Sequence, residues 1–266
     1  MATADLGDVG IGYSTFGDDA ADPVVGIMGF SLDKRFWSTQ VPAVTPTHRF
    51  VTFDNRGIGR SRGPLVSTID EMANDTVRLM DHLQLDDAVL FGMSMGGTIA
   101  QRVALDHPDR VKALILAVTW ARPIEYMRRQ HDVTRKILQI APEELLAASL
   151  LKMFTPRFFE LGRETVDQLI KVIRAEGPPT AEAVAVLAAQ LDAIDKFDVL
   201  GQLPAIDCPT LVIGGRLDMI VPAFGAEEIA GAIPGADLVM LETGHGCMVE
   251  EMESFNEAVS RFLRAV

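Results

Sequence analysis

The chain has 266 residues, which is enough for one large domain or for a domain that carries an insertion. Its net charge is −13, 48% of its residues are hydrophobic, and it contains no run of lysine and arginine. This composition is typical of a globular protein and excludes nucleic acid as an expected partner. No apolar run reaches the length that crosses a membrane, so no membrane partner is expected either.

The cysteines and histidines favour a simple, metal-free protein. Cys208 and Cys247 are too few for a disulfide framework, and no C-x-x-C motif is present. The N-terminus lacks the basic and apolar regions of a secretory signal peptide, so a reducing, cytoplasmic location is expected. The five histidines show no zinc-binding spacing, and we expect neither a metal site nor a cofactor.

In the first half of the chain, short apolar runs alternate with stretches of helical periodicity. Nearly continuous apolar runs, typical of strands covered on both faces, occupy residues 24–29, 49–54, 88–93 and 113–118. Apolar residues at helical spacing predict helices over residues 67–85 and 96–110. This alternation indicates a parallel sheet with helices on both faces.

The alternation stops after residue 118 and resumes near residue 210. Residues 122–200 show amphipathic helical patterns interrupted by proline and no convincing strand. The remaining chain predicts a strand, a helix, a strand and a closing helix at residues 210–215, 222–233, 236–242 and 252–263. We therefore expect an α/β core from residues 1–121 and 201–266, with residues 122–200 inserted as a helical lid over a pocket.

The sequence GMSMGG places Ser94 between a predicted strand and a predicted helix. Gly92 and Gly96 stand two residues on either side, where a tight strand-to-helix bend leaves no room for a side chain. This is the pattern of a nucleophile elbow, which lifts a serine hydroxyl above the sheet. The bend also directs the N–H of Met95 toward a developing negative charge. The alternative is a glycine-rich turn in which Ser94 only caps the helix.

A serine hydroxyl needs a base that removes its proton, and the base needs an acid that orients it. His245 follows the last predicted strand on a loop between two glycines, and we predict that it is the base. Asp218 follows the strand at 210–215, and we predict that it is the acid; the alternative is that it caps the next helix. The order serine, aspartate, histidine is that of α/β-hydrolases, not of chymotrypsin or subtilisin.

With these residues placed, nearly the whole chain resembles the α/β-hydrolase fold superfamily. The similarity lies in GMSMGG, in Asp218 within GRLDMIVP, in Gly244-His245, and in FDNRGIGRS at residues 53–61. The resemblance implies a mostly parallel eight-stranded sheet flanked by helices, with the lid inserted after the sixth strand. The motifs are most similar to 3-oxoadipate enol-lactonase-like and cofactor-free haloperoxidase-like hydrolases. Epoxide hydrolases and haloalkane dehalogenases have aspartate where this chain has Ser94.

The resemblance also implies roles for two loops. FDNRGIGRS matches a D-x-R-G-x-G-x-S segment that buttresses the oxyanion loop in this family; a phosphate loop is the alternative, but its glycine spacing differs by one residue. The oxyanion loop itself follows the strand at 24–29 and has Met28-Gly29-Phe30-Ser31 where many relatives have His-Gly. By position, the N–H groups of Phe30 and Met95 are expected to form the oxyanion hole.

Together these residues predict a serine hydrolase that cleaves a small-molecule carboxylic ester or lactone through an acyl-enzyme. The pocket is expected to be mostly apolar, and its predicted lining residues are Trp37, Trp120, Met127 and Met219. At the start of the lid, three arginines either bind a substrate carboxylate or form a solvated helix face: Arg122, Arg128 and Arg129.

Other functions stay open. A protein of this fold with an intact triad can serve as a ligand receptor or catalyse cyclisation or elimination. Peroxide attack on the acyl-enzyme would add a haloperoxidase or perhydrolase activity. An intact triad and oxyanion hole favour hydrolysis. The sequence leaves the natural substrate open, and also whether the chain forms a homo-oligomer.

Overall fold

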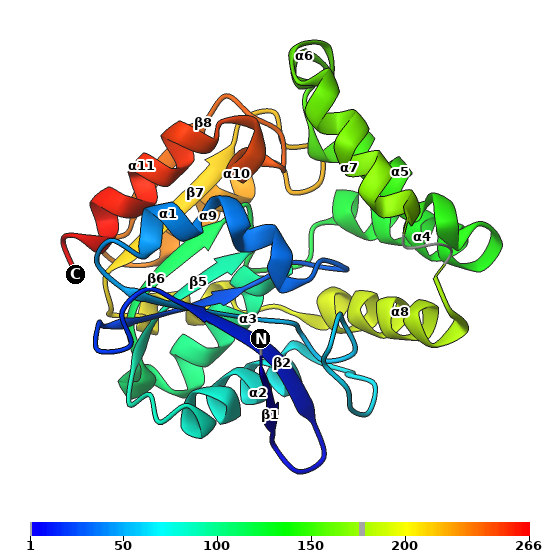
Figure 1. The fold of residues 1–266 in the computed structure, drawn as a ribbon. Coiled ribbons are helices and arrows are strands. Elements are labelled where there is room, and N and C mark those ends of the chain that lie inside the picture. The colour runs from blue at the N-terminus through cyan, green and yellow to red at the C-terminus, as the bar shows by residue number, and fades with distance from the viewer. Residues whose placement is uncertain (1, 176–178) are drawn as a thin grey trace.

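The computed structural model describes residues 2–175 and 179–266, and within them eight strands form one sheet (Figure 1). The spatial order is β1-β2-β4-β3-β5-β6-β7-β8. The pairs β1–β2 and β2–β4 are antiparallel, and all other neighbours are parallel. The strands are β1 Ala2–Asp5, β2 Gly10–Phe16, β3 Pro23–Ile27, β4 Arg49–Phe53, β5 Ala88–Met93, β6 Val111–Ala117, β7 Thr210–Gly215 and β8 Asp237–Leu241. The predicted mostly parallel eight-stranded sheet is confirmed.

Helices cover both faces of this sheet and bury two separate apolar clusters. Helices α2, α3 and α9 pack on one face, and α1, α10 and α11 pack on the other (Figure 1). Their bounds are α1 Val41–Val44, α2 Ile69–His82, α3 Met95–Asp106, α9 Phe224–Ala232, α10 Cys247–Glu250 and α11 Met252–Leu263. Three short 3-10 helices accompany them: η1 Lys34–Thr39, η2 Pro108–Arg110 and η4 Leu200–Ala205.

A group of helices lies between β6 and β7 along the chain and stands together to one side of the sheet (Figure 1). The group consists of α4 Glu125–Ile140, η3 Pro142–Glu144, α5 Leu145–Met153, α6 Pro156–Leu161, α7 Arg163–Ala175 and α8 Ala181–Lys196. The insertion follows the sixth strand, as the resemblance implied. We keep the name lid for residues 122–200, of which 176–178 lie outside the described residues.

Local sequence explains the start of α2, the helix that follows the loop at 53–61. Thr68 accepts a hydrogen bond from the N–H of Glu71, and the Glu71 carboxylate accepts one from the N–H of Thr68. This capping box satisfies two backbone donors that a helix otherwise leaves unpaired. The buried residues of α2, among them Met72 and Met80, then face the sheet.

Candidate active site

The bend at Ser94 has the geometry of a nucleophile elbow. Ser94 is the single residue between β5 and α3, and its backbone has φ +54° and ψ −121°, a conformation that side chains disfavour. A Cβ at Gly96 would lie 1.9 Å from the Ile27 carbonyl oxygen, and one at Gly92 would lie 2.4 Å from the Gly96 oxygen. The predicted need for glycine at both positions is confirmed. The Ser94 side chain forms no capping hydrogen bond with α3, so the alternative of a simple cap is wrong.

Ser94, His245 and Asp218 lie in contact, each after the carboxyl end of a strand. Ser94 Oγ is 3.0 Å from His245 Nε2, and His245 Nδ1 is 2.7 Å from Asp218 Oδ2. The other carboxylate oxygen of Asp218 accepts hydrogen bonds from the backbone N–H groups of Ile220 at 2.7 Å and Val221 at 2.9 Å. The three side chains belong to residues that are only 5–8% exposed. With its Nδ1 proton donated to the buried carboxylate, the imidazole has Nε2 available to accept the serine proton.

The loop that carries His245 is held by the lid. The N–H of Gly246 donates to the Met153 carbonyl at 2.7 Å, and the N–H of Gly244 donates to Glu250 Oε2 at 3.0 Å. The Glu250 carboxylate also accepts the N–H and the hydroxyl of Thr155, which lies between α5 and α6. The sequence analysis missed Glu250, because nothing in the pattern distinguishes it from the adjacent Glu251.

Cys247 follows this loop, but its thiol is expected to be unreactive. It is fully buried, and burial raises the pKa of its thiol far above the usual value, with the nearby Asp218 charge acting in the same direction. A thiol in such surroundings stays protonated at neutral pH and is a poor nucleophile. Cys247 is therefore not a candidate for the nucleophile at this site.

Two backbone N–H groups are available beside Ser94. The loop after β3 passes so close that a Cβ at Gly29 would lie 3.0 Å from Ser94 Cβ. Phe30, the next residue, lines the same cavity as Ser94, and its N–H donates to no described residue. Met95 is the first residue of α3, where an N–H has no partner within the helix.

The loop at 53–61 supports this region through a buried carboxylate. The Asp54 carboxylate forms an ion pair with the Lys34 ammonium at 2.6 Å. It also accepts hydrogen bonds from the backbone N–H groups of Lys34 and Arg60, both at 2.9 Å. The side-chain amide of the adjacent Asn55 donates a hydrogen bond to the Met28 carbonyl at 2.8 Å, in the loop that carries Phe30. The N–H of Arg60, which a phosphate loop would leave free for its ligand, is thus already bound to a carboxylate of the same loop, which speaks against a phosphate-binding role.

A cavity of about 70 Å³ lies in front of Ser94. Trp120 and Met127 line it, as predicted, together with Phe30. Trp37, which was also predicted, does not line the cavity. It belongs to η1, and its ring packs on the sheet with its centroid 4.5 Å from that of the Phe91 ring. Met219 is 56% exposed and is not among the lining residues.

Several polar lid residues line the cavity that the sequence analysis did not identify. His131 on α4 faces it and bonds through Nδ1 to Asp195 at 2.6 Å, and burial lowers the pKa of His131 despite that partner. The others are Gln130, Thr134, Ser149 and Lys152. Helical spacing alone does not show which face of α4 or α5 turns toward Ser94, so no sequence signal marked them.

The three arginines at the start of the lid do not reach the cavity. Arg122 pairs with Glu228 at 2.5 Å, and Arg129 pairs with Glu125 at 2.7 Å. Arg128 is exposed. Arg128 and Arg129 thus lie on a solvated helix face, whereas Arg122 precedes the helix.

Two features are absent from the described residues. No helix there is both long enough and apolar enough to cross a membrane. No group of three or more histidine, cysteine or acidic side chains in residues 2–175 and 179–266 is arranged to hold a metal ion.

A sequence profile described as the alpha/beta hydrolase fold matches residues 22–251. The chain is 32% identical over 260 residues to a Caulobacter vibrioides protein named carbamate hydrolase RutD, covering 96% of this chain and 95% of the relative. It is 29% identical to 3-oxoadipate enol-lactonase 2 of Acinetobacter baylyi, covering 97% and 94%. The crystal structure of the enol-lactonase from Burkholderia xenovorans LB400 matches with a TM-score of 0.89 and 29% identity, covering 99% and 100%. The chain therefore belongs to the alpha/beta hydrolase fold family and is a hydrolase of that family.

Proposed function

We propose that the protein hydrolyses a small carboxylic ester or lactone, with Ser94 as nucleophile, His245 as general base and Asp218 as the acid that orients the imidazole. One observation carries the proposal: the unbroken chain of contacts from Ser94 Oγ to His245 Nε2 at 3.0 Å and from His245 Nδ1 to Asp218 at 2.7 Å. These distances are those at which a base takes a proton and an acid holds a base.

In the first half of the reaction, Ser94 Oγ attacks the carbonyl carbon while its proton passes to His245 Nε2. The carbonyl oxygen becomes an oxyanion, which accepts hydrogen bonds from the N–H groups of Phe30 and Met95. Asp218 stabilises the imidazolium. The tetrahedral intermediate collapses, the ester C–O bond breaks, and His245 gives its proton to the leaving alcohol oxygen.

In the second half, water replaces the alcohol. His245 removes a proton from the water, whose oxygen attacks the acyl carbon of the Ser94 ester. The same two N–H groups stabilise the second oxyanion. When that intermediate collapses, Ser94 Oγ leaves and takes back the proton from His245, and the carboxylic acid is released.

The direct test measures p-nitrophenyl butyrate hydrolysis by the wild type and Ser94→Ala. We expect kcat to fall at least about 1,000-fold, because the nucleophile and its attack are lost together. Ser14→Ala, a change on β2 far along the sheet from the site, is the control and should keep wild-type kcat. A fluorophosphonate probe should label the wild type at Ser94 and not the variant. Equal turnover in the two proteins would refute the proposal.

Carbamate hydrolysis is a second candidate, favoured by the 32% identity to a relative named as a carbamate hydrolase. The same triad would attack a carbamate carbonyl and form a carbamoyl-enzyme. Carbamoyl-enzymes lose their acyl group slowly. Fast, steady release of p-nitrophenol from a p-nitrophenyl carbamate would favour this candidate, whereas a single burst without further turnover would favour esters and lactones.

We further propose a reducing compartment such as the cytoplasm as the place of action. Both cysteines are free: Cys247 is buried and Cys208 is partly buried. Burial raises the pKa of Cys208 to about 11. Free cysteines are typical of proteins in a reducing compartment, which supports the proposal.

A further inference from the structure

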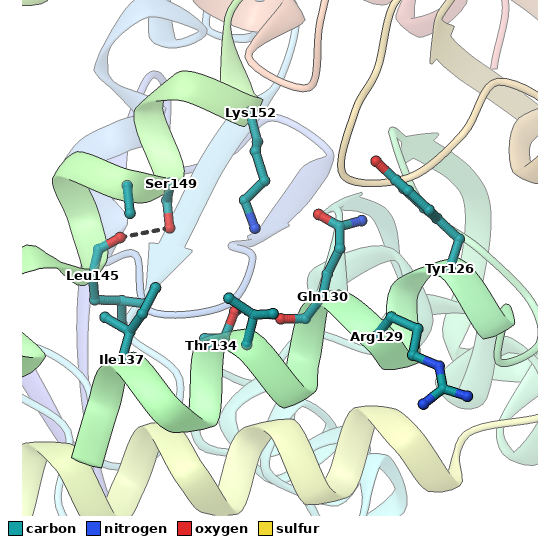
Figure 2. A pocket seen from close by; sticks show the side chains of 10 residues that line it. Tyr126, Arg129, Gln130, Thr134, Ile137, Leu145, Ser149 and Lys152 are labelled. Atoms are coloured by element: carbon teal, nitrogen blue, oxygen red, sulfur yellow. Dashed lines mark hydrogen bonds between the residues drawn. The ribbon is translucent and has the colours of Figure 1, made fainter. Parts of the chain in front are cut away.

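A groove of about 350 Å³ opens between α4 and α5 (Figure 2). It shares four lining residues with the cavity that holds Ser94. These four form what we call the neck: Gln130, Thr134, Ser149 and Lys152. All four are polar, whereas much of the remaining groove wall is apolar. The groove and the cavity thus meet at a polar neck.

Lys152 brings the only charge to this neck. Figure 2 shows its side chain extending from α5 toward Gln130 and Thr134 on α4. No carboxylate of the described residues pairs with it, and burial lowers the pKa of its ammonium with no opposite charge to offset the effect. Arg129, which lines the outer groove, is instead paired with Glu125 at 2.7 Å.

The neutral members of the neck are held in place by their own helices and by the core. The Thr134 hydroxyl donates to the Gln130 carbonyl at 2.9 Å, and the Ser149 hydroxyl donates to the Leu145 carbonyl at 2.8 Å. The Gln130 amide donates to the Ile220 carbonyl at 3.1 Å. Among the described residues, no aspartate or glutamate lines either the groove or the cavity that the Lys152 ammonium faces.

We propose that Lys152 binds a free carboxylate on the acyl part of the substrate, so that the enzyme prefers esters or lactones carrying one negative charge there. This inference rests on the proposed function. A partly desolvated ammonium gains most from a charged acceptor, and one unpaired cation matches the single charge of a carboxylate.

The position of the cavity assigns the carboxylate to the acyl side. The leaving alcohol must lie beside His245, which protonates its oxygen. The cavity that leads to the neck is lined by Ser94 and Phe30, and His245 is not among its lining residues. The acyl chain therefore extends from Ser94 toward Lys152, while the alcohol leaves on the imidazole side.

The test compares two methyl esters of matched size, monomethyl glutarate and methyl pentanoate, which differ only in a carboxylate replacing a methyl group. Hydrolysis is followed by pH-stat titration, and the readout is the ratio of the two kcat/KM values. The wild type should favour the charged ester. Lys152→Met should lower the ratio about 10- to 100-fold, the worth of a charged hydrogen bond. Monomethyl succinate and monomethyl adipate test a shorter and a longer distance between the ester carbonyl and the free carboxylate.

Lys136→Met is the matched control, because it removes the same charge from an exposed position on α4 outside the groove and cavity. Its ratio should equal that of the wild type, and Lys152→Arg should retain much of the preference. An unchanged ratio in Lys152→Met across the three chain lengths would overturn the role of Lys152 while leaving ester hydrolysis intact. If the wild type hydrolyses neither these esters nor p-nitrophenyl butyrate, the proposed function falls as well.

Discussion

The sheet core and the lid differ in how completely they bury their apolar side chains. Every residue of β5 and β7 is buried. In the lid, by contrast, Ile140, Leu151 and Leu161 are 71–81% exposed, and a separate buried cluster consists, among the described residues, of four leucines. A densely packed scaffold holds groups to within fractions of an ångström, whereas a loosely packed one tolerates change. The difference suggests that the core fixes the reacting groups and the lid adapts the site to its substrate.

The largest expected effect tests how little room the core leaves. Gly96→Ala places a Cβ 1.9 Å from the Ile27 carbonyl oxygen, where the contact is with backbone and cannot relax cheaply. We expect a loss of more than about 4 kcal/mol in the free energy of unfolding, or no folded protein. Gly231→Ala in α9 meets nothing within 4 Å and is the control. It should be neutral or stabilising by up to about 1 kcal/mol in urea denaturation.

A second comparison sets a buried ion pair of the core against an exposed one of the lid. Asp54→Asn leaves the Lys34 ammonium, whose side chain is 6% exposed, without its counter-ion. We expect the free energy of unfolding, measured by urea denaturation, to fall by about 3–5 kcal/mol. Glu125→Gln breaks the exposed pair with Arg129 on α4 and should cost no more than about 0.5 kcal/mol. Similar costs for both changes would contradict the contrast between the regions.

Truncated leucines sharpen the same contrast. Leu114 in β6 is 0% exposed, and Leu138 in the lid cluster is 3% exposed. Truncating a buried leucine to alanine lowers the free energy of unfolding by about 2–5 kcal/mol. We expect a loss near the upper end of this range for Leu114→Ala and near its lower end for Leu138→Ala. The reason is that the small lid cluster can collapse around a cavity more easily than the sheet. Thermal unfolding of both variants checks the order, and a larger loss at Leu138 would reverse our view.

The smallest effect concerns the link between the two regions. Glu250→Gln replaces a carboxylate that accepts hydrogen bonds from Gly244 and Thr155, and so loosens the His245 loop. We expect kcat for p-nitrophenyl butyrate to fall about tenfold, with little change in KM, because proton transfer and not binding is disturbed. Glu253→Gln, exposed on α11, should match the wild type. An unaltered kcat together with a lowered Tm would reduce Glu250 to a structural role.

Much of the core could be predicted because its signals are local. Strands that are buried on both faces appear as apolar runs, and the glycines around Ser94 report a steric requirement that the structure reproduces. The first two strands were missed. In β1 only Ala4 is buried, and β2 pairs at the antiparallel end of the sheet, so neither forms a continuous apolar run.

The lining of the site could be predicted only in part, because it depends on how helices turn in three dimensions. Trp37 and Trp120 both follow strands and look equivalent in the sequence. Because Gly26 has no side chain, the sheet has room for the Trp37 ring, and Trp37 is buried in the core. Trp120 instead lines the cavity. Lys152 faces inward through the packing of α5 against α4, which no motif encodes.

The backbone conformation of Ser94 sets activity against stability. A side chain held at φ +54° costs about 1–3 kcal/mol, which the surrounding packing must offset, whereas glycine adopts this conformation without strain. A descendant of this protein that no longer used the proposed nucleophile would gain stability by exchanging Ser94 for glycine.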